Sequence, residues 1–431
     1  MSKLGKRVEP FRPLLYNRKI AGEPATVVAP PYDLIGAARQ HQLYDRSPYN
    51  VVRLEFGRDA DRYAASRKTL NEWLAAKVLE RAPRPAIYHY RQSFDVEGHV
   101  IHRTGYIARV KLEEFGHGRI VPHEKTFPAA KEDRLKLLTA IEVNTSSIFG
   151  LYSGKHPELD ELRERVAARE PLFDFEDDLG TRNELRPIEA ADEIATIQRE
   201  LESSRILIAD GHHRYETSLN YRRERRATNP FQEPQPYDYT MMTLVACDDP
   251  GLVILPTHRV VKSLDANAVA RFAERARENF EVEEIAHRGA FRVKMDESGQ
   301  GTIGVTLKGS RSFFVLGLRN RAALESALPG VPREVRELDV SVLHALIFDR
   351  IFGIKPEQVR KGGNIEYTIE TGGALGAVAQ GRADGAFIMT PPSIQDVERV
   401  SDAGATMPEK STYFYPKLLT GLVMNPIFDS D

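Results

Sequence analysis

The sequence is poor in cysteine and contains no long hydrophobic run. A single cysteine, Cys247, among 431 residues excludes an internal disulfide framework. No window approaches the roughly 20 apolar residues of a membrane-spanning helix, and the first residues lack the apolar core of a secretion signal. From these absences we expect a soluble, cytoplasmic protein without a membrane partner.

The sequence also lacks an excess of charge of either sign. Lys and Arg number 60 against 62 Asp and Glu, which gives a formal net charge of -2. A global basic excess would be typical of a nucleic-acid-binding protein, so any phosphate site in this chain must be local. With 41% hydrophobic and 28% charged residues, the composition is globular, and the length is sufficient for two or three domains.

Patterns typical of strands and of helices alternate along the chain. Apolar alternation predicts a hairpin of residues 86–94 and 104–111 around a Glu-Gly turn, and a central strand at 240–247. Helical spacing predicts helices at 61–79, 130–141 and 156–170. We therefore expect an α/β (α+β) protein with mixed sheets. The predicted regions are an N-terminal α/β region, 1–152, a middle α/β unit, 153–264, and a C-terminal α/β lobe, 265–431.

The stretch 205–219 gathers more chemically capable groups than any other part of the sequence. The apolar run 206–208 predicts a buried strand, Asp210 and Gly211 end it, and helical spacing resumes at Tyr215. In such a strand–turn–helix arrangement, the N–H groups of the turn and the positive end of the helix converge and can hold a phosphate. The candidate catalytic residues are Asp210, His212 and His213, and the candidate phosphate ligands are Gly211 and Arg214.

Two other interpretations of this stretch stay open. The paired histidines can be solvated surface, with Asp210 as an ordinary N-cap of the following helix. A metal site is the weaker alternative, because no third His or Cys lies nearby at a ligand spacing.

A second polar cluster lies at 121–126, in a predicted loop before the helix at 130–141. His123, Glu124 and Lys125 place a base, a carboxylate and an ammonium on consecutive residues. If another segment supplies the anion-binding turn, Glu124 can act in catalysis, and His123 and Lys125 can contact phosphate. An ordinary surface loop is an equally strong interpretation.

Further polar residues stand at the ends or on the faces of predicted elements. Residues 27–33 predict a strand that ends at a proline pair. Residues 50–57 predict a strand with an Arg and a Glu on one face. The segment 142–147 follows a predicted helix. The stretch 407–417, which includes Lys417, is interpreted either as a third wall of the site or as a surface loop. The candidate substrate contacts are Tyr32, Asp33, Arg53, Glu55, Asn144, Lys410, Ser411 and Thr412.

One more apolar run, 253–261, predicts a strand. His258 and Arg259 stand near its end and could equally be edge residues.

Five segments, in order, resemble a bacterial and archaeal family known as a conserved domain of unknown function. They are residues 29–33, 48–55, 122–126, 209–216 and 410–417. Members are often labelled ParB-like, because their Asp-Gly-His-His-Arg turn resembles the phosphate-binding turn of the ParB/sulfiredoxin superfamily, which includes kinases of free L-serine. The resemblance implies a ParB/sulfiredoxin-like phosphate-binding unit with additional lobes. It also implies phosphoryl transfer to free serine, with pyrophosphate or a nucleotide as donor.

A kinase of this kind needs a phosphate cradle, a cation and a proton acceptor, and Mg²⁺ is its expected cofactor. Its expected partners are a hydroxy amino acid and a phosphoryl donor. The alternative is a ParB-like, nucleotide-dependent DNA-binding protein. For that alternative the sequence offers a short basic run, Arg222, Arg223, Arg225 and Arg226, which can also be a solvated helix face. The donor, the exact acceptor, the general base and a homodimeric state stay open.

Overall fold

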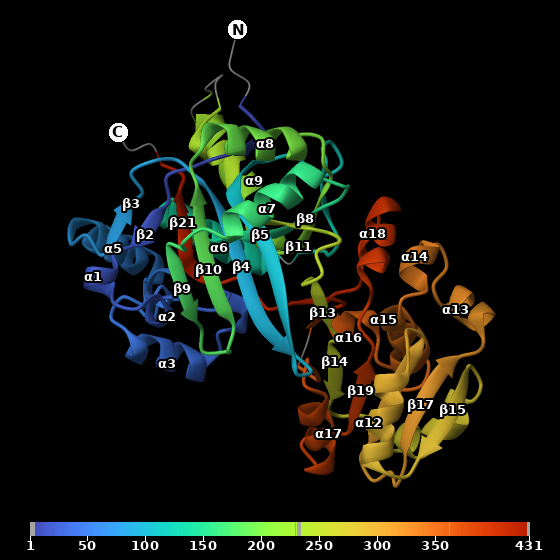
Figure 1. Ribbon diagram of the computed structural model, residues 1–431. Helices are drawn as coiled ribbons and strands as arrows, with labels where there is room; N and C mark the ends of the chain where they lie inside the picture. Colours follow the sequence, from blue (N-terminus) through green and yellow to red (C-terminus); the bar gives the residue numbers. More distant parts are fainter. Residues whose placement is uncertain (1–4, 127, 229, 231–233, 362, 429–431) are drawn as a thin grey trace. The chain divides into compact units, whose positions relative to one another are not determined.

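The computed structural model describes residues 5–126, 128–228, 230, 234–361 and 363–428 (Figure 1). The described residues form two compact units. Unit 1 comprises those within Met1–Pro122, Thr126–Leu252 and Pro416–Asp431, and unit 2 comprises His123–Lys125 and Val253–Tyr415. The predicted division into three regions stays a prediction, and the large sheet of unit 1 takes strands from both sides of residue 152. Among the helices of the described residues, none has the length and apolar character that crossing a membrane requires.

A mixed, nine-stranded sheet of described residues forms the centre of unit 1. Its order is β6-β11-β8-β12-β5-β4-β10-β9, with β1 paired to β5. Strand β11 runs parallel to β6 and antiparallel to β8. The strands are β1 (Val8–Glu9), β4 (Ile87–Val96), β5 (His99–Lys111), β6 (Ile120–Pro122), β8 (Ile148–Tyr152), β9 (Phe173–Glu176), β10 (Arg182–Ile188), β11 (Ile206–Asp210) and β12 (Tyr239–Ala246).

The hairpin β4–β5 confirms the clearest strand prediction. Its two-residue turn consists of Glu97 and Gly98, with φ angles of 54° and 83°. Positive φ at both central residues is the geometry that matches the twist of the two strands, and Gly adopts it without a Cβ clash. The predicted central strand is confirmed as β12, which lies between β8 and β5.

Three helices share one hydrophobic core with the large sheet. They are α7 (Pro157–Ala167), α8 (Ala191–Leu201) and α9 (His212–Thr228). Leu162, Ile197 and Leu219 from these helices are buried with Ile208 and Leu244 of the strands. Because the apolar positions recur at helical spacing, each helix presents one face to the core.

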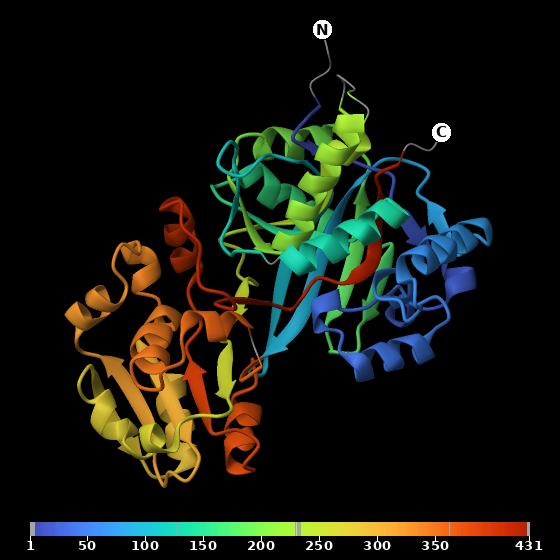
Figure 2. The ribbon, with the colours of Figure 1, turned by 180° about the vertical axis from the view of Figure 1, so that it is seen from behind.

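A smaller sheet of described residues completes unit 1, in the order β3-β2-β21-β7. Its strands are β2 (Leu14–Tyr16), β3 (Leu79–Arg81), β7 (Val143–Ser146) and β21 (Thr420–Pro426). Trp73 of α5 and Met424 of β21 belong to the core of this part. The remaining helices of unit 1 are α1 (Arg18–Ala21), α2 (Pro24–Val27), η1 (Tyr32–Leu34), α3 (Ala37–Arg46), α4 (Val52–Glu55), α5 (Arg62–Ala75), α6 (Pro128–Ile141) and η2 (Pro236–Asp238). Helix α6 lies beside α9 (Figure 2).

Two predicted strands, 27–33 and 50–57, are wrong. The structure places the ends of α2 and the short helix η1 in the first segment, and α4 in the second. The fully buried Asn50 explains α4: its side-chain oxygen accepts from the N–H of Val52 at 3.0 Å, while its amide donates to the carbonyl oxygens of Thr26 and Val28. This side-chain turn lies directly before the N-cap residue, Val51, and leads into a helix that the alternation of apolar residues does not reveal.

Unit 2 contains a six-stranded sheet of described residues in the order β15-β17-β16-β19-β14-β18, and a separate pair, β13-β20. Its strands are β13 (Val253–Leu255), β14 (His258–Val261), β15 (Phe280–Ile285), β16 (Thr302–Leu307), β17 (Phe313–Leu318), β18 (Ile365–Thr368), β19 (Gly385–Met389) and β20 (Tyr413–Tyr415). The strand predicted at 253–261 is thus divided into β13 and β14. His258 and Arg259 are not edge residues, because β14 lies between β19 and β18.

Helices cover both faces of the six-stranded sheet. On one face, Val261 belongs to a core with Phe272 of α11 and Phe348 of η3. On the other face, the preceding residue, Val260, belongs to a core with Phe291 of α12. The helical elements of unit 2 are α10 (Ala266–Ala270), α11 (Phe272–Ala276), α12 (Arg288–Glu297), α13 (Arg321–Ala327), α14 (Arg333–Arg336), α15 (Asp339–Val342), the π-helical η3 (Leu343–Asp349), α16 (Pro356–Lys361), α17 (Thr371–Ala379) and α18 (Ile394–Asp402).

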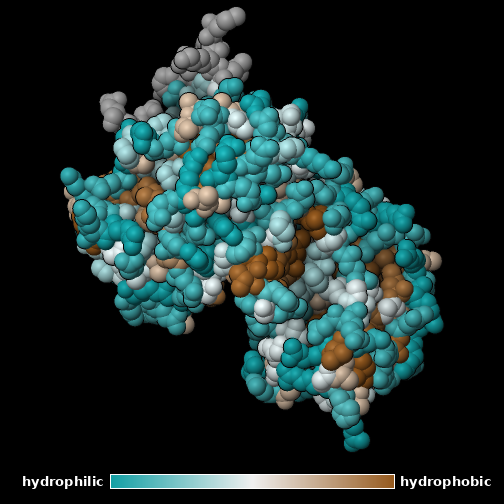
Figure 3. Space-filling model, viewed as in Figure 1, coloured by the Kyte–Doolittle hydropathy of each residue, from teal (hydrophilic) through white to brown (hydrophobic). Residues whose placement is uncertain are grey.

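Both units combine helices with mixed or antiparallel sheets, so the predicted α/β (α+β) class is confirmed. The visible surface is mainly hydrophilic, with local hydrophobic patches on each unit (Figure 3).

Candidate active site

The predicted strand–turn–helix is present in unit 1. Strand β11 ends at Asp210, and α9 begins at His212. Gly211 between them has a φ of 92°, and a Cβ atom on it would lie 2.9 Å from Nη2 of Arg214. The turn therefore requires glycine for two reasons, its left-handed backbone and the arginine that folds back over it.

A cluster of three charged side chains occupies the turn. Oδ1 of Asp210 lies 2.6 Å from Nζ of Lys417, and its Oδ2 accepts from Nη2 of Arg214 at 2.9 Å. The other terminal nitrogen of Arg214 donates to Oγ of Ser146 and to the carbonyl oxygen of Ser147, both at 2.8 Å. One carboxylate thus holds two cations at the positive end of α9.

The cations determine the protonation state of Asp210. Burial alone would raise the pKa of this carboxyl, but Lys417 and then Arg214 outweigh burial and hold the pKa well below its ordinary range. Asp210 therefore stays ionised near neutral pH. A carboxylate this acidic is a poor general base, and it is better suited to orient Lys417 and Arg214.

Buried side chains position the backbone of Lys417. Nη2 of Arg103 donates to the carbonyl oxygen of Pro416 at 2.5 Å. The side-chain amide of Gln92 donates to the carbonyl oxygen of Lys417 at 3.4 Å. Arg103 also lies over the ring of Phe149, 4.7 Å from its centroid. Burial lowers the pKa of Arg103 to about 10, so it remains a cation near Asp210.

A small cavity of about 50 Å³ brings together three of the predicted residues, Arg214, Glu55 and Asn144. Oε1 of Glu55 lies 2.8 Å from Nη1 of Arg134, and the hydroxyl of Thr145 donates to its other oxygen. The side-chain oxygen of Asn144 accepts from the amide of Asn425 at 2.8 Å. Glu55 and Asn144 are therefore held by structural contacts beside the turn.

Tyr32, Asp33 and Arg53 have different environments. The guanidinium carbon of Arg134 lies 4.1 Å from the centroid of the Tyr32 ring. Burial raises the pKa of Tyr32, while Arg134 and Arg214 oppose the shift, which places this phenol in the same electrostatic environment as the turn. Asp33 is exposed, and Arg53 donates to the carbonyl oxygen of Tyr44 at 2.9 Å. Since Arg53 and Glu55 are two residues apart on a helix, they do not share a face.

Parts of the two predicted loops, residues 123–125 and 407–412, meet within unit 2. A ring nitrogen of His123 lies 2.9 Å from Oγ1 of Thr412, and the N–H of Lys410 donates to Oε1 of Glu124 at 3.2 Å. Ser411 donates to the carbonyl oxygen of Pro408, and Lys125 is exposed. The catalytic and binding roles of these residues stay predictions.

The first turn of α9 is fixed by its own side chains. His212 is buried and His213 is half-buried at the start of the helix. The hydroxyl of Tyr215 donates to the carbonyl oxygen of Glu113 and accepts from its N–H, both at 2.9 Å. Glu216 accepts from Nζ of Lys131 at 2.5 Å. These contacts hold α9 rigidly behind the turn.

A family model described as "Protein of unknown function (DUF1015)" matches residues 8–341. The chain belongs to this family. A comparison with curated proteins finds no match. The predicted membership of a family of unknown function is thus confirmed, whereas the ParB/sulfiredoxin-like label stays a prediction.

Several solved structures resemble this DUF1015 member. A conserved hypothetical protein from Pyrococcus furiosus has 14% identity and a TM-score of 0.33, covering 72% of this chain and 96% of that chain. A free serine kinase in complex with AMP has 16% identity and a TM-score of 0.33, covering 69% and 83%. SbnI with a C-terminal truncation, from Staphylococcus aureus, has 11% identity and a TM-score of 0.34, covering 73% and 85%. At these TM-scores the likeness carries no inference about activity.

Each arginine of the basic run of this DUF1015 chain lies near a carboxylate. Glu114 pairs with both Arg222 and Arg223, and Asp238 pairs with Arg226. The remaining arginine, Arg225, lies 3.8 Å from Glu142. The run therefore does not favour the alternative DNA-binding function, which needs cations available to phosphates.

Sequence reasoning missed four groups of the DUF1015 site: Ser146, Ser147, Arg103 and the direct role of Lys417. Lys417 stood in a segment that could form a wall of the site, and the two serines follow a predicted helix. The sequence therefore gave some indication of these three residues. Arg103 stood just before the predicted strand 104–111, where a lone arginine gives no signal.

Proposed function

We propose that unit 1 carries a small-molecule kinase site that transfers a phosphoryl group to the hydroxyl of free L-serine. The donor is pyrophosphate or a nucleotide, and the product is O-phosphoserine. The observation that carries this proposal is the cluster of Lys417, Asp210 and Arg214 at the glycine turn before α9. The choice of serine is supported by the resemblance of the five segments to a family that includes serine kinases.

The cluster suits the electrostatic demands of phosphoryl transfer. Charge spreads over the oxygens of the transferring group, so catalysis depends chiefly on fixed cations and backbone N–H donors. Lys417 and Arg214 supply two cations, and the start of α9 supplies N–H groups and a positive dipole end. Asp210 keeps both cations oriented before the donor arrives.

The half-buried His213 is the group to which we assign proton transfer. Its imidazole accepts the proton of the serine hydroxyl as the new O–P bond forms and the bond from phosphorus to the donor oxygen breaks. Asp210 is not the group that accepts this proton, because its lowered pKa makes it a weak proton acceptor.

Mg²⁺ fits this site as an ion bound mainly through the donor's phosphates. The described residues contain no group of three His, Cys, Asp or Glu side chains that could hold a metal by themselves. Mg²⁺ commonly binds through phosphate oxygens together with one or two carboxylates, and the carboxylate at this turn, Asp210, already binds Lys417 and Arg214. When bound, the ion would neutralise charge on the donor.

Phosphorus NMR tests the proposal directly. The full chain is incubated with Mg²⁺ and L-serine and, separately, with ATP, ADP or pyrophosphate. We expect the phosphomonoester signal of O-phosphoserine with at least one donor, and no donor consumption when L-alanine, which lacks the hydroxyl, replaces L-serine. The proposal fails if no donor is consumed in a serine-dependent way.

A further inference from the structure

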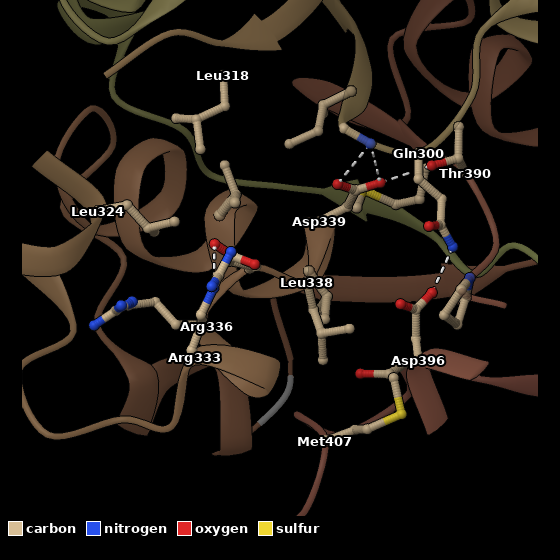
Figure 4. Close-up of a pocket in the computed structure, with 18 of the residues that line it drawn as sticks. Gln300, Leu318, Leu324, Arg333, Arg336, Leu338, Asp339, Thr390, Asp396 and Met407 are labelled. Carbon is tan, nitrogen blue, oxygen red and sulfur yellow. Dashed lines mark hydrogen bonds and ion pairs between the residues drawn. The ribbon is translucent and has the colours of Figure 1, made fainter. Parts of the chain in front are cut away.

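A cavity of about 520 Å³ lies within unit 2 (Figure 4). It opens on the face of the six-stranded sheet that carries the core with Phe280, Ile303 and Leu324. Figure 4 shows Leu318, Leu324 and Leu338 on its walls. This volume is within the range of cavities that hold small organic ligands, and its lining combines apolar side chains with polar and charged ones.

Arginines near the opening already have carboxylate partners. Arg336 lies 3.2 Å from Glu325, and Nε of Arg333 lies 3.0 Å from Glu337. Arg399 pairs with Asp396 in the same way. These pairs leave little uncompensated charge at the opening.

Arg259 is different from these arginines. It is one of the residues that line the cavity, it is 1% exposed, and its Nη2 donates to the carbonyl oxygen of Lys410 at 2.9 Å. Its Nη1 donates to the carbonyl oxygen of Thr257, but its Nε has no hydrogen-bond partner. Among the described residues, no carboxylate pairs with Arg259. A buried cation without a counter-ion is unfavourable, and a bound anion would compensate it.

Thr257 adds a second donor at the same cavity. Thr257 is 6% exposed and lines the cavity, and its hydroxyl has no hydrogen-bond partner among the described residues. Buried polar groups are nearly always hydrogen-bonded, so two unpartnered donors at one cavity indicate a ligand. An N–H and an O–H match the two oxygens of a carboxylate, whereas a phosphate dianion would require more donors.

Asp339 restricts the charge of the ligand. Its oxygens accept from the N–H of Gly301 at 3.0 Å and from the hydroxyl of Thr390 at 2.7 Å, and it too lines the cavity. A second anionic group on the ligand would meet this carboxylate and be repelled. The cavity therefore favours a ligand with one negative charge.

We propose that the unit-2 cavity binds a small organic monocarboxylate with an apolar body. The carboxylate accepts hydrogen bonds from Nε of Arg259 and Oγ1 of Thr257, and the apolar body lies against Phe280, Leu318 and Leu324. This site goes beyond the proposed kinase function, because neither a phosphoryl donor nor the cluster at Asp210 takes part in it.

Isothermal titration calorimetry on the full chain, without any phosphoryl donor, tests this site. The probes are straight-chain carboxylates from acetate to decanoate, the amide of each, and inorganic phosphate. We expect affinity to rise by about threefold to fourfold for each added CH₂ until the cavity is full, as apolar burial predicts. The amides should bind at least about tenfold more weakly, and phosphate should not compete.

Variants locate the binding. Thr257→Val removes the hydroxyl at nearly constant volume and should weaken the best carboxylate by roughly fivefold to tenfold. Leu318→Trp fills the cavity and should abolish binding of the longer carboxylates. Arg321→Gln is the matched control, because this arginine lines the opening but its side chain is 75% exposed and pairs with Glu337. It should bind like the wild type.

Arg259→Met removes the cation itself and should abolish the preference for carboxylate over amide, with circular dichroism as the check that it folds. The proposal is overturned if no carboxylate of the series binds at about 10 mM, a concentration that detects even millimolar affinity. It is also overturned if carboxylates and amides bind equally, or if both Thr257→Val and Leu318→Trp bind like the wild type.

Discussion

Arg214 in unit 1, which is half-buried, and Arg259 in unit 2, which is buried, both lie beside a cavity, but their charges are compensated differently. Arg214 pairs with Asp210 and also donates to Ser146. Arg259 donates to carbonyl oxygens and has no carboxylate partner among the described residues. A compensated cation can stay ordered until an anion exchanges for its partner. An uncompensated one raises the energy of the empty site and favours any anion that fits.

The same contrast has consequences for stability. Removing one member of a compensated buried pair leaves a charge without its partner, which is strongly unfavourable. Removing an uncompensated cation leaves no such charge. The loss of stability on removing the arginine should therefore be large for a compensated pair and small for Arg259.

The largest effect is expected for Arg134→Met in unit 1. This change leaves Glu55, which is 4% exposed, without its cation and should lower the free energy of unfolding by about 3–5 kcal/mol. Denaturant unfolding followed by the fluorescence of Trp73 measures it, because this sole tryptophan lies in the neighbouring core. Arg199→Gln breaks an exposed pair and should cost less than about 1 kcal/mol. Equal effects of both variants would contradict the expectation.

The next effect is a pH dependence in unit 2. Burial, and then Arg259, lower the pKa of His258 to about 4 and that of His344 to about 3. Because the unfolded chain binds these protons near pH 6.5, their contribution to stability is complete above that pH and is lost as the pH falls toward 4. His344→Leu should reduce this loss by on the order of 2 kcal/mol at pH 4. Thermal melts by circular dichroism between pH 7 and 4 measure it, and an unchanged pH slope in the variant would refute it.

A smaller effect distinguishes the glycine of the turn. Gly211→Ala and Gly180→Ala both place alanine at a positive φ, which should cost about 1 kcal/mol. At position 180 the added methyl meets open space, whereas at 211 it meets the guanidinium of Arg214. We therefore expect serine phosphorylation to fall only in Gly211→Ala. Equal activity in the two variants would show that the position of Arg214 is unimportant.

The smallest effect is expected for Arg259→Met. The loss of two hydrogen bonds and the removal of an uncompensated buried cation oppose each other, so the free energy of unfolding should change by less than about 1 kcal/mol. Denaturant unfolding followed by circular dichroism at pH 7 measures the change. A loss as large as that of Arg134→Met would mean that Arg259 has a counter-charge after all.

Local patterns were sufficient where the structure depends on neighbours in sequence. The turn at Glu97 and Gly98, the helix α7 and the β11–Gly211–α9 unit could all be predicted, because turn chemistry and apolar periodicity decide them. The helix α4 could not, since the Asn50 side chain just before it is held by contacts with a separate segment.

The composition of the site was harder to predict than its turn. Lys417 reaches Asp210 across 207 positions in sequence, and a neighbouring stretch, Lys410 to Thr412, belongs to unit 2 instead. Nothing in the local pattern tells where the chain passes from one unit to the other. The acidity of Asp210 also depends on two cations that only the folded chain brings to it.

The steady-state kinetics of Lys417→Gln test the central claim most directly. Asp210 orients Lys417. In the proposed site Lys417 contacts the donor phosphates through a charge-assisted hydrogen bond of a kind worth about 1.5–3 kcal/mol, so its loss should lower kcat/KM for the donor at least about tenfold in phosphoserine formation. Arg223→Gln, a change at an exposed position farther along α9, should keep the wild-type rate. If folded Lys417→Gln instead forms phosphoserine at the wild-type rate, the cluster at Asp210 is structural and the proposed kinase site is wrong.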